Sequence, residues 1–134
     1  MPKVLLVKEL SQRRFVYSYV VRMSAFLNLT KMELLILVLI TWRFYILKHK
    51  GISEINRRIQ VLSPDGRGEI REQIEKETKK SISIYNFNNY IKSLKDKGAI
   101  IQKGKNYDIN SWFYPESQIT FKYEVNEKLD KYLG

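Results

Sequence analysis

The chain has 134 residues, of which 44% are hydrophobic, so it is long enough for one domain and too apolar for a disordered protein. It contains no cysteine, which excludes disulfides and thiolate metal sites and is typical of proteins in a reducing cytoplasm. The chain has a formal net charge of +10, and the positive excess lies in residues 1–109, since residues 110–134 are slightly acidic. This charge predicts a polyanionic partner (DNA, RNA or an acidic protein surface), although an AT-rich genome also explains a high lysine content.

Residues 1–28 are predicted to form an added N-terminal β segment, with the pattern of a hairpin. Lys3 to Leu10 and Arg14 to Arg22 have the composition of extended segments, and a short polar turn separates them. The same residues also fit a helix, so both alternatives stay open. The apolar run near Met1 is too short for a signal peptide. If the second segment is a strand, one of its faces carries Phe15, Tyr17, Tyr19 and Val21.

A buried helix is predicted to begin at Thr30 and to run to about Leu47. Thr30 and Glu33 have the spacing of a capping box, in which each side chain accepts a hydrogen bond from the other residue's backbone amide. Leu34 to Ile40 are consecutive apolar residues, which places this helix at the centre of the fold. A membrane span needs about 20 such residues, so the pattern predicts a core helix and no membrane partner.

A shorter helix is predicted from Ser53 to Val61, followed by a turn. The sequence Ser-Pro-Asp-Gly from Ser63 to Gly66 is typical of a turn, because proline fixes φ and the other residues accept tight geometry. The helix pattern directs three apolar side chains inward and two arginines outward. The inward residues are Ile55, Ile59 and Leu62, and the outward residues are Arg57 and Arg58.

The stretch from Gly68 to Ile109 has the pattern helix, short turn, helix, glycine stop and β-hairpin. One helix is predicted over Glu69 to Thr78, and the next begins after a Ser83 cap, with apolar residues spaced by three, four and three positions. Gly98 supplies the left-handed residue expected just past a helix end. A strand, a basic tip and a return strand follow.

This order predicts a winged helix-turn-helix and an α+β fold class. The winged-helix domain is expected at residues 29–110, and residues 111–134 are expected to form a C-terminal aromatic segment, a strand and a tail. The strand prediction rests on the alternation of apolar and polar residues from Gln118 to Val125. The expected core residues are Leu34, Leu35, Leu37, Val38, Ile70, Ile74, Phe87, Ile91, Leu94, Ile100 and Ile109.

Winged helices bind far more often than they catalyse, and one interpretation of this chain is binding to double-stranded DNA. The helix from Ser83 to Lys97 would enter a major groove, and the hairpin tip would contact flanking phosphates. Asparagine side chains on that helix can bind the N6/N7 edge of adenine with two hydrogen bonds. The candidate contact residues, for nucleic acid or for a protein partner, are Lys79, Lys80, Tyr85, Asn86, Asn88, Asn89, Lys92, Lys103 and Lys105.

Two features argue against sequence-specific reading of DNA. The recognition helix contains no arginine, although arginine or lysine on guanine is the commonest specific base contact. The preceding helix carries several glutamates that would repel phosphates if they faced DNA. They are Glu69, Glu72, Glu75 and Glu77. A solvated helix with asparagines as caps and surface residues explains the same pattern.

The C-terminal part is more hydrophobic than a minimal wing requires, and it indicates either additional core or a surface for another chain. A strand can pair with a neighbouring chain, and exposed aromatic residues can anchor one. The candidate protein-interface residues are Trp112, Phe113, Tyr114, Ile119, Phe121 and Tyr123.

Catalysis is not expected. With one histidine, His49, and no cysteine, the chain offers no Ser-His-Asp or Cys-His set and no ligand cluster for a metal. Gly66 to Gly68 lack the lysine and hydroxyl residue that complete a phosphate-binding loop. We therefore expect no cofactor, no metal site and no small-molecule substrate.

The residues from Asn86 to Ile101, together with Tyr107 to Asn110, resemble small winged-helix proteins of tailed bacteriophages, in particular those of the crAss-like group. Similar motifs are Leu29-Thr30 with Glu33, the exit from Ile109 to Pro115, and the strand from Ile119 to Glu124, so the resemblance covers about residues 29–125.

This resemblance, together with the absence of arginine from the recognition helix and the hydrophobic C-terminal strand, favours a structural or assembly module of a tailed phage particle, at the portal or head–tail neck. Its partners would be other virion proteins or further copies of itself in an oligomer, and its basic face would meet DNA or an acidic partner. The alternative is a phage-encoded DNA-binding regulator of transcription or replication. These functions place the protein in the virion or in the host bacterial cytoplasm.

Overall fold

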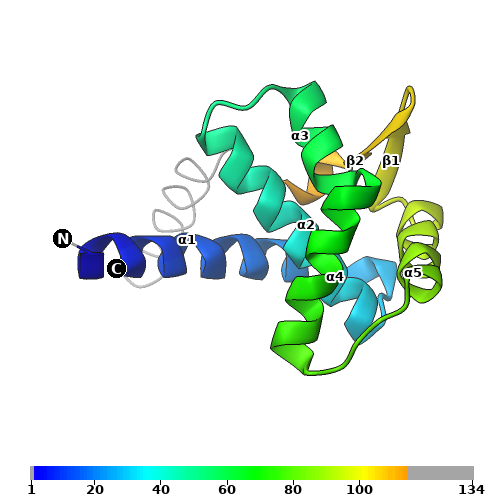
Figure 1. The fold of residues 1–134 in the computed structure, drawn as a ribbon, viewed down its shortest axis with the longest axis horizontal. Coiled ribbons are helices and arrows are strands. Elements are labelled where there is room, and N and C mark those ends of the chain that lie inside the picture. The colour runs from blue at the N-terminus through cyan, green and yellow to red at the C-terminus, as the bar shows by residue number, and fades with distance from the viewer. Residues whose placement is uncertain (1, 115–134) are drawn as a thin grey trace, which may run out of the picture.

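The computed structural model describes residues 2–114, with side chains from residue 12 onward, as an α+β fold (Figure 1). The predicted strand after Gln118 lies outside the described residues. The helices are α1 (Pro2–Met23), α2 (Lys31–His49), α3 (Glu54–Leu62), α4 (Pro64–Thr78) and α5 (Ile84–Asp96). Two short 3-10 helices are η1 (Ala25–Leu27) and η2 (Ser111–Phe113), and the strands are β1 (Ile100–Lys103) and β2 (Asn106–Ile109).

The N-terminal β segment predicted for residues 1–28 is wrong, because residues 2–23 form α1. Val16, Val20 and Ser24 follow one another at intervals of four, and all three are buried. A spacing of four residues repeats on one face of a helix, whereas a strand would have buried alternate residues. Packing against α2 therefore selected the helical alternative that the sequence also allowed.

Helix α2 is the centre of the fold and packs against α1, α3, α4 and α5. The predicted capping box at its start is confirmed: the Thr30 hydroxyl accepts from the Glu33 amide at 3.2 Å, and the Glu33 carboxylate accepts from the Thr30 amide at 3.0 Å. Because neighbours surround the helix, its apolar residues are needed on almost every side. Within the described residues, the structure contains no helix that is both long and apolar enough to cross a membrane.

Ser63 to Gly66 do not form the predicted free-standing turn. Ser63 ends α3 and also caps α4, since its hydroxyl accepts from the Gly66 amide at 3.3 Å and Pro64 occupies the first helical position. A side chain at Gly66 would collide with the backbone carbonyls of Gln60 and Val61. The glycine therefore allows close backbone contact where α3 and α4 meet.

The orientation predicted for α3 is wrong in part, because Leu62 is buried as predicted but Ile55, Ile59 and Arg58 are not placed as predicted. Ile55 and Ile59 are exposed, with 60% and 46% of their surfaces accessible, whereas Val61 and Leu62 are buried. Arg58 points inward and is only 13% exposed, because it pairs with Asp108 of β2. Tertiary contacts, in particular the ion pair between Arg58 and Asp108, therefore decided which side of α3 faces the core, against the spacing of Ile55 and Ile59.

The hairpin follows α5 as the sequence predicts. Gly98 has φ of +85° after α5, and Gly104 has φ of +65° at the tip between the two strands. The strands pair antiparallel from Ile100 opposite Ile109 to Lys103 opposite Asn106. Of the expected core residues, all are buried except Leu34 and Leu35, which are partly buried and pack against the core.

Candidate nucleic-acid interface

Helix α5 has one buried face and one exposed face. Phe87, Ile91 and Leu94 are at most 4% exposed and anchor it in the core. Ser83 caps the helix by accepting from the Asn86 amide at 3.0 Å. The opposite face of α5 is exposed, because none of the described residues packs over it. It carries several of the residues predicted to contact nucleic acid or a partner. These residues are Tyr85, Asn86, Asn88, Asn89 and Lys92.

The two lysines of the predicted turn lie at the surface, just before α5. Lys79 ends α4 in the left-handed conformation, with φ of +60°, and its amide donates to the Glu75 carbonyl. The Lys80 amide donates to the Thr78 hydroxyl at 3.3 Å. These hydrogen bonds fix the backbone of the connection, so both side chains project from a defined position.

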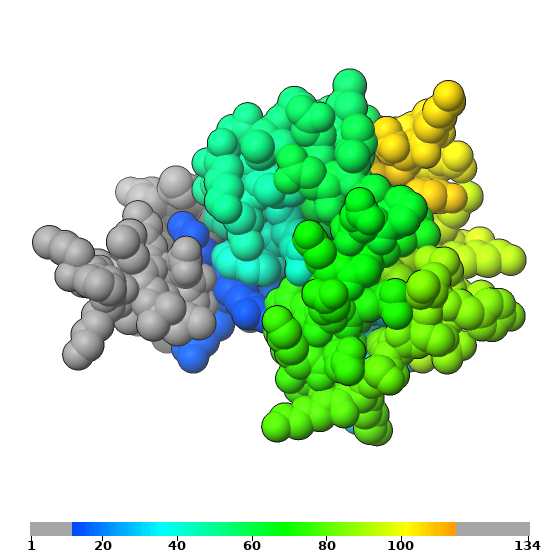
Figure 2. All heavy atoms as spheres, viewed as in Figure 1, coloured from blue at the N-terminus to red at the C-terminus, as the bar shows by residue number. Residues whose placement is uncertain are grey.

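The hairpin tip lies at the same edge of the molecule as α5, as Figure 2 shows. Lys103 and Lys105, on either side of Gly104, are exposed. The structure therefore brings the helix face and the basic tip, which are about ten residues apart in the sequence, to one side of the fold.

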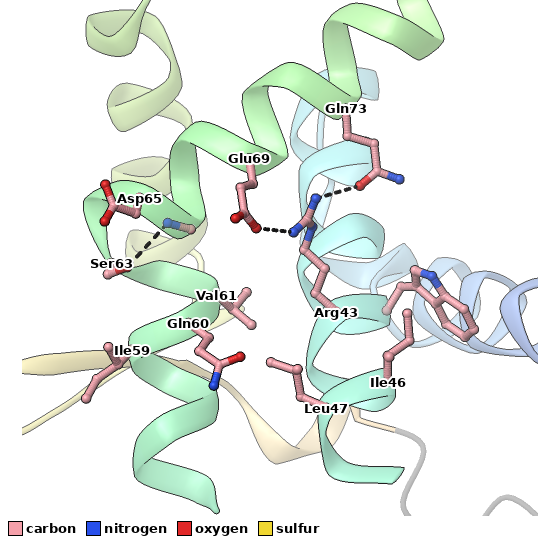
Figure 3. Close-up of a pocket in the computed structure, with 12 residues that line it drawn as sticks. Arg43, Ile46, Leu47, Ile59, Gln60, Val61, Ser63, Asp65, Glu69 and Gln73 are labelled. Carbon is pink, nitrogen blue, oxygen red and sulfur yellow. Dashed lines mark hydrogen bonds and ion pairs between the residues drawn. The ribbon is translucent and has the colours of Figure 1, made fainter. Parts of the chain in front are cut away.

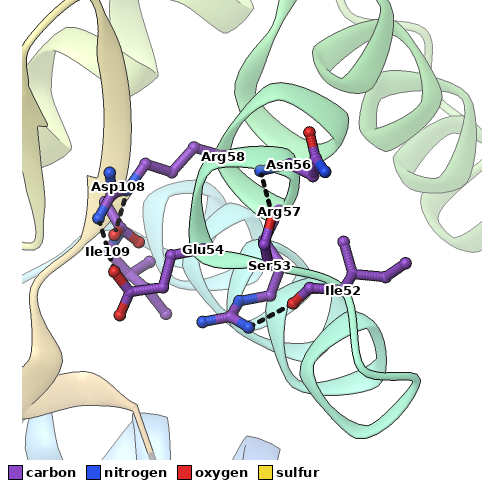
Figure 4. A network of polar contacts seen from close by, with 8 residues as sticks. All are labelled: Ile52, Ser53, Glu54, Asn56, Arg57, Arg58, Asp108 and Ile109. Atoms are coloured by element: carbon purple, nitrogen blue, oxygen red, sulfur yellow. Dashed lines mark hydrogen bonds and ion pairs between the residues drawn. The ribbon is translucent and has the colours of Figure 1, made fainter.

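The hairpin is held against α3 by Arg58 (Figure 4). Its guanidinium donates to the Asp108 carboxylate at 2.8 Å and to Glu54 at 3.3 Å. Arg58 and Asp108 are 13% and 17% exposed, so this ion pair is shielded from water on most sides. The contact fixes the direction in which the hairpin leaves the core.

Helix α5 is also locked to the start of α2. The Glu33 carboxylate is 3% exposed and accepts from the Ser93 hydroxyl at 2.6 Å and from the Lys97 ammonium at 3.0 Å. Burial alone raises the pKa of Glu33, but hydrogen bonds from Ser93, Thr30 and Lys97 outweigh it and lower the pKa from 4.5 to about 2. Glu33 is thus ionised at neutral pH and holds the C-terminal half of α5 in place.

Arg67 is a residue of this site that the sequence analysis did not identify. It belongs to α4, but its Nη1 donates to the Asn88 side-chain oxygen on α5 at 3.0 Å. Its guanidinium also lies 5.3 Å from the centroid of the Tyr107 ring on β2. Partial burial lowers the pKa of Arg67, which stays protonated at neutral pH because arginine ionises far above it. An arginine therefore stands beside the exposed face of α5, although α5 itself contains none.

Two of the four glutamates on α4 are directed away from α5. The Glu69 carboxylate accepts from Arg43 of α2 at 2.9 Å, and the Glu77 carboxylate accepts from Arg13 of α1 at 2.6 Å. Both lie on the side of α4 that faces α1 and α2. The repulsion expected from these two carboxylates is therefore reduced by ion pairing and by distance from the α5 face.

The aromatic residues after the hairpin have different environments. Phe113 is 2% exposed and belongs to the core, so its prediction as an interface residue is wrong, whereas Trp112 is 55% exposed. Phe26, which is 69% exposed, stacks on Phe113 with centroids 6.4 Å apart. Tyr114 is partly buried against α2. The predicted interface residues Ile119, Phe121 and Tyr123 lie outside the described residues.

A cleft of about 500 Å³ lies between α2, α3 and α4 (Figure 3). Its apolar wall includes Trp42 and Leu47. Arg43 crosses it and donates to Glu69 at 2.9 Å and to Gln73 at 3.1 Å. Arg43, Glu69 and Gln73 are thus bonded to one another and hold α4 against α2.

Comparisons with protein-family models, with curated proteins and with solved structures found no match to this chain. In the part of the chain that the structure describes, no three histidine, aspartate or glutamate side chains gather in a group that could hold a metal ion.

Proposed function

We propose that residues 64–109 form a winged helix-turn-helix and that the protein is a non-catalytic module that binds double-stranded DNA. In this proposal α5 lies in the major groove and the hairpin tip contacts the flanking phosphates. B-form DNA has a major groove about 12 Å wide, which admits one α-helix.

The observation that carries the proposal is the exposed polar face of α5. Tyr85 is 74% exposed, and three asparagines and Lys92 lie on the same helix at the surface. Amide and ammonium groups of this kind hydrogen-bond to base edges, and the groups can reach a groove because the other face of α5 anchors the helix.

The positive charge around this face supports the same proposal. Lys103 and Lys105 stand at the hairpin tip, and Lys79 and Lys80 precede α5 in the chain, so exposed cations occur before and after the helix in the sequence. Lysines in such positions neutralise phosphates and release counterions, which makes binding strongly dependent on salt.

Fluorescence anisotropy with a labelled duplex of about 20 base pairs tests the proposal across about 50–200 mM salt. Replacing both Lys103 and Lys105 by alanine should weaken binding several-fold and reduce the salt slope by about 2. The matched control replaces two exposed cations elsewhere, Arg14 on α1 and Lys50 after α2. Lys50 follows the end of α2, whereas α5 contacts the start of that helix. Because the 19 residues of α2 span about 28 Å, Lys50 lies far from α5.

Equal losses in the two double variants would mean that DNA responds only to overall charge, and the proposed interface would be wrong. Replacing Asn86, Asn88 and Asn89 together by alanine tests the reading face itself. A regulator should prefer one sequence over random duplex by orders of magnitude and lose that preference in this triple variant, whereas a scaffold should bind all duplexes weakly with a steep salt slope.

The exposed aromatic pair supports a second candidate, an assembly module. Phe26 and Trp112 are more than half exposed, Phe26 stacks on the buried Phe113 and Trp112 precedes Phe113 in the chain; exposed aromatic side chains are frequent anchors of protein interfaces. With the phage resemblance, this favours a component of a tailed phage particle that contacts other virion proteins or further copies of itself. Mass spectrometry of purified particles tests it: absence of the protein from the particles would exclude the structural role and leave the regulator.

A further inference from the structure

We propose that Arg67 and Asn88 act together to select guanine in the major groove, an inference that rests on the DNA-binding function proposed above. The sequence pattern suggested that the asparagines of α5 read adenine. The hydrogen bond between α4 and α5 changes what Asn88 can offer.

The Arg67 guanidinium is held by three contacts before any DNA arrives. Its Nε donates to the Leu62 carbonyl at 2.9 Å, its Nη1 donates to the Asn88 Oδ1 at 3.0 Å, and the group lies over the Tyr107 ring. An arginine fixed in this way loses little conformational entropy when it makes a further hydrogen bond. The remaining nitrogen, Nη2, has no hydrogen-bond partner among the described residues.

The same hydrogen bond fixes the orientation of the Asn88 amide. Its oxygen turns toward Arg67, so its nitrogen Nδ2, with two N–H donors, is the atom left for DNA. Adenine needs an asparagine that accepts from N6 with its oxygen and donates to N7 with its nitrogen. Arg67 takes one of the two acceptor positions of the Asn88 oxygen and holds that oxygen toward α4, so the oxygen is less available for this pairing.

The groups that Arg67 and Asn88 leave without a partner are therefore mainly donors, Nη2 of Arg67 and Nδ2 of Asn88. Guanine is the base that presents two acceptors, N7 and O6, on its major-groove edge. On adenine the second donor would meet the N6 amino group, which is itself a donor, and cytosine presents an amino donor at the same edge. This donor-rich pair thus matches guanine better than adenine or cytosine at one position of the site.

Selection of tight-binding duplexes from a randomised pool, followed by anisotropy on the selected site, tests the inference with the wild-type chain. We expect an enriched guanine whose replacement by 7-deazaguanine, which lacks the N7 acceptor, weakens binding between about fivefold and about a hundredfold. Substitution of 7-deazaadenine in the same base pair position of an adenine-containing duplex should have no such effect.

Variants then assign the preference to the two residues. Asn88→Ala and Arg67→Ala should each abolish discrimination between guanine and 7-deazaguanine, and Asn88→Asp, which replaces donors by acceptors, should shift the preference toward cytosine. The matched control is Asn56→Ala on α3, an exposed asparagine that should leave the guanine preference unchanged.

The outcomes separate this inference from the proposed function. Binding to duplex DNA without a guanine preference, or with one that survives in both Arg67→Ala and Asn88→Ala, would overturn the inference and leave the DNA-binding proposal standing. An adenine preference that depends on Asn88 would overturn it in the same way. A chain that binds no duplex at all overturns both.

Discussion

Replacing Glu33 by glutamine tests how the structure holds α5 in place. Glu33 is almost completely buried, and its carboxylate receives hydrogen bonds from Thr30, Ser93 and Lys97. Glutamine keeps an oxygen for the Thr30 amide, since it is also found at this position of capping boxes. It removes the negative charge that faces the Lys97 ammonium, so the change acts mainly on the link between α2 and α5.

The magnitude follows from the pKa of Glu33. Lowering the pKa from 4.5 to about 2 corresponds to about 3 kcal/mol, at about 1.4 kcal/mol for each pKa unit. Because the pKa is lower in the folded state, the ionised carboxylate stabilises the fold above pH 4.5. This contribution is lost as the pH falls from about 5 toward 2. We therefore expect Glu33→Gln to reduce the free energy of unfolding by about 3 kcal/mol at pH 7 and by much less near pH 2.

Urea denaturation followed by circular dichroism, repeated between pH 2 and pH 7, measures this difference. Glu72→Gln is the matched control, because Glu72 is exposed on α4 and should change stability by less than about 0.5 kcal/mol. If Glu33→Gln were as stable as the wild type at pH 7, or lost the same stability at every pH, the assigned role of the carboxylate would be refuted.

Three further predictions concern packing and the hairpin. Gly66→Ala should destabilise the fold by about 2 kcal/mol or more, because the new Cβ meets backbone carbonyls of α3. At Gly68 the Cβ meets open space, so Gly68→Ala should stabilise the fold by about 0.5–1 kcal/mol in the same denaturation assay. Phe87→Ala should cost about 3–5 kcal/mol, since the ring is fully buried under α5, and a loss below about 1 kcal/mol would contradict its place in the core. A double-mutant cycle of Arg58→Met and Asp108→Asn should give a coupling energy of about 1 kcal/mol or more, and additive effects would show that the ion pair does not hold the hairpin.

Local signals in the sequence predicted much of the fold between Thr30 and Ile109. The capping box at Thr30, the Ser83 cap and the Gly98 stop each depend on one residue and its immediate neighbours, and the structure confirms all three. The spacing of Phe87, Ile91 and Leu94 likewise identified the buried face of α5. Such features can be predicted from the sequence, because the interacting groups are close together in the chain and their spacing sets the distance between them.

The same local reasoning failed where two structures fit one pattern. Residues 12–23 alternate like a strand and also repeat every four positions, and only contact with α2 decides for the helix that buries Val16 and Val20. In α3, the pairing of Arg58 with Asp108, fifty residues away, turns Ile55 toward solvent. At Ser63 the proline that suggested a turn is the first residue of α4.

The sequence by itself located the helices between Thr30 and Asp96, except for the start of α4, and the polar face of α5, because helix caps and apolar spacing act over a few residues. Only the tertiary structure decided what stands beside that face. It brought Arg67 to Asn88 across 21 positions and Glu33 to Ser93 across 60, and no local pattern encodes either pair. The chemistry offered by the exposed face therefore depends on hydrogen bonds between helices, whose partners are fixed only when the core packs.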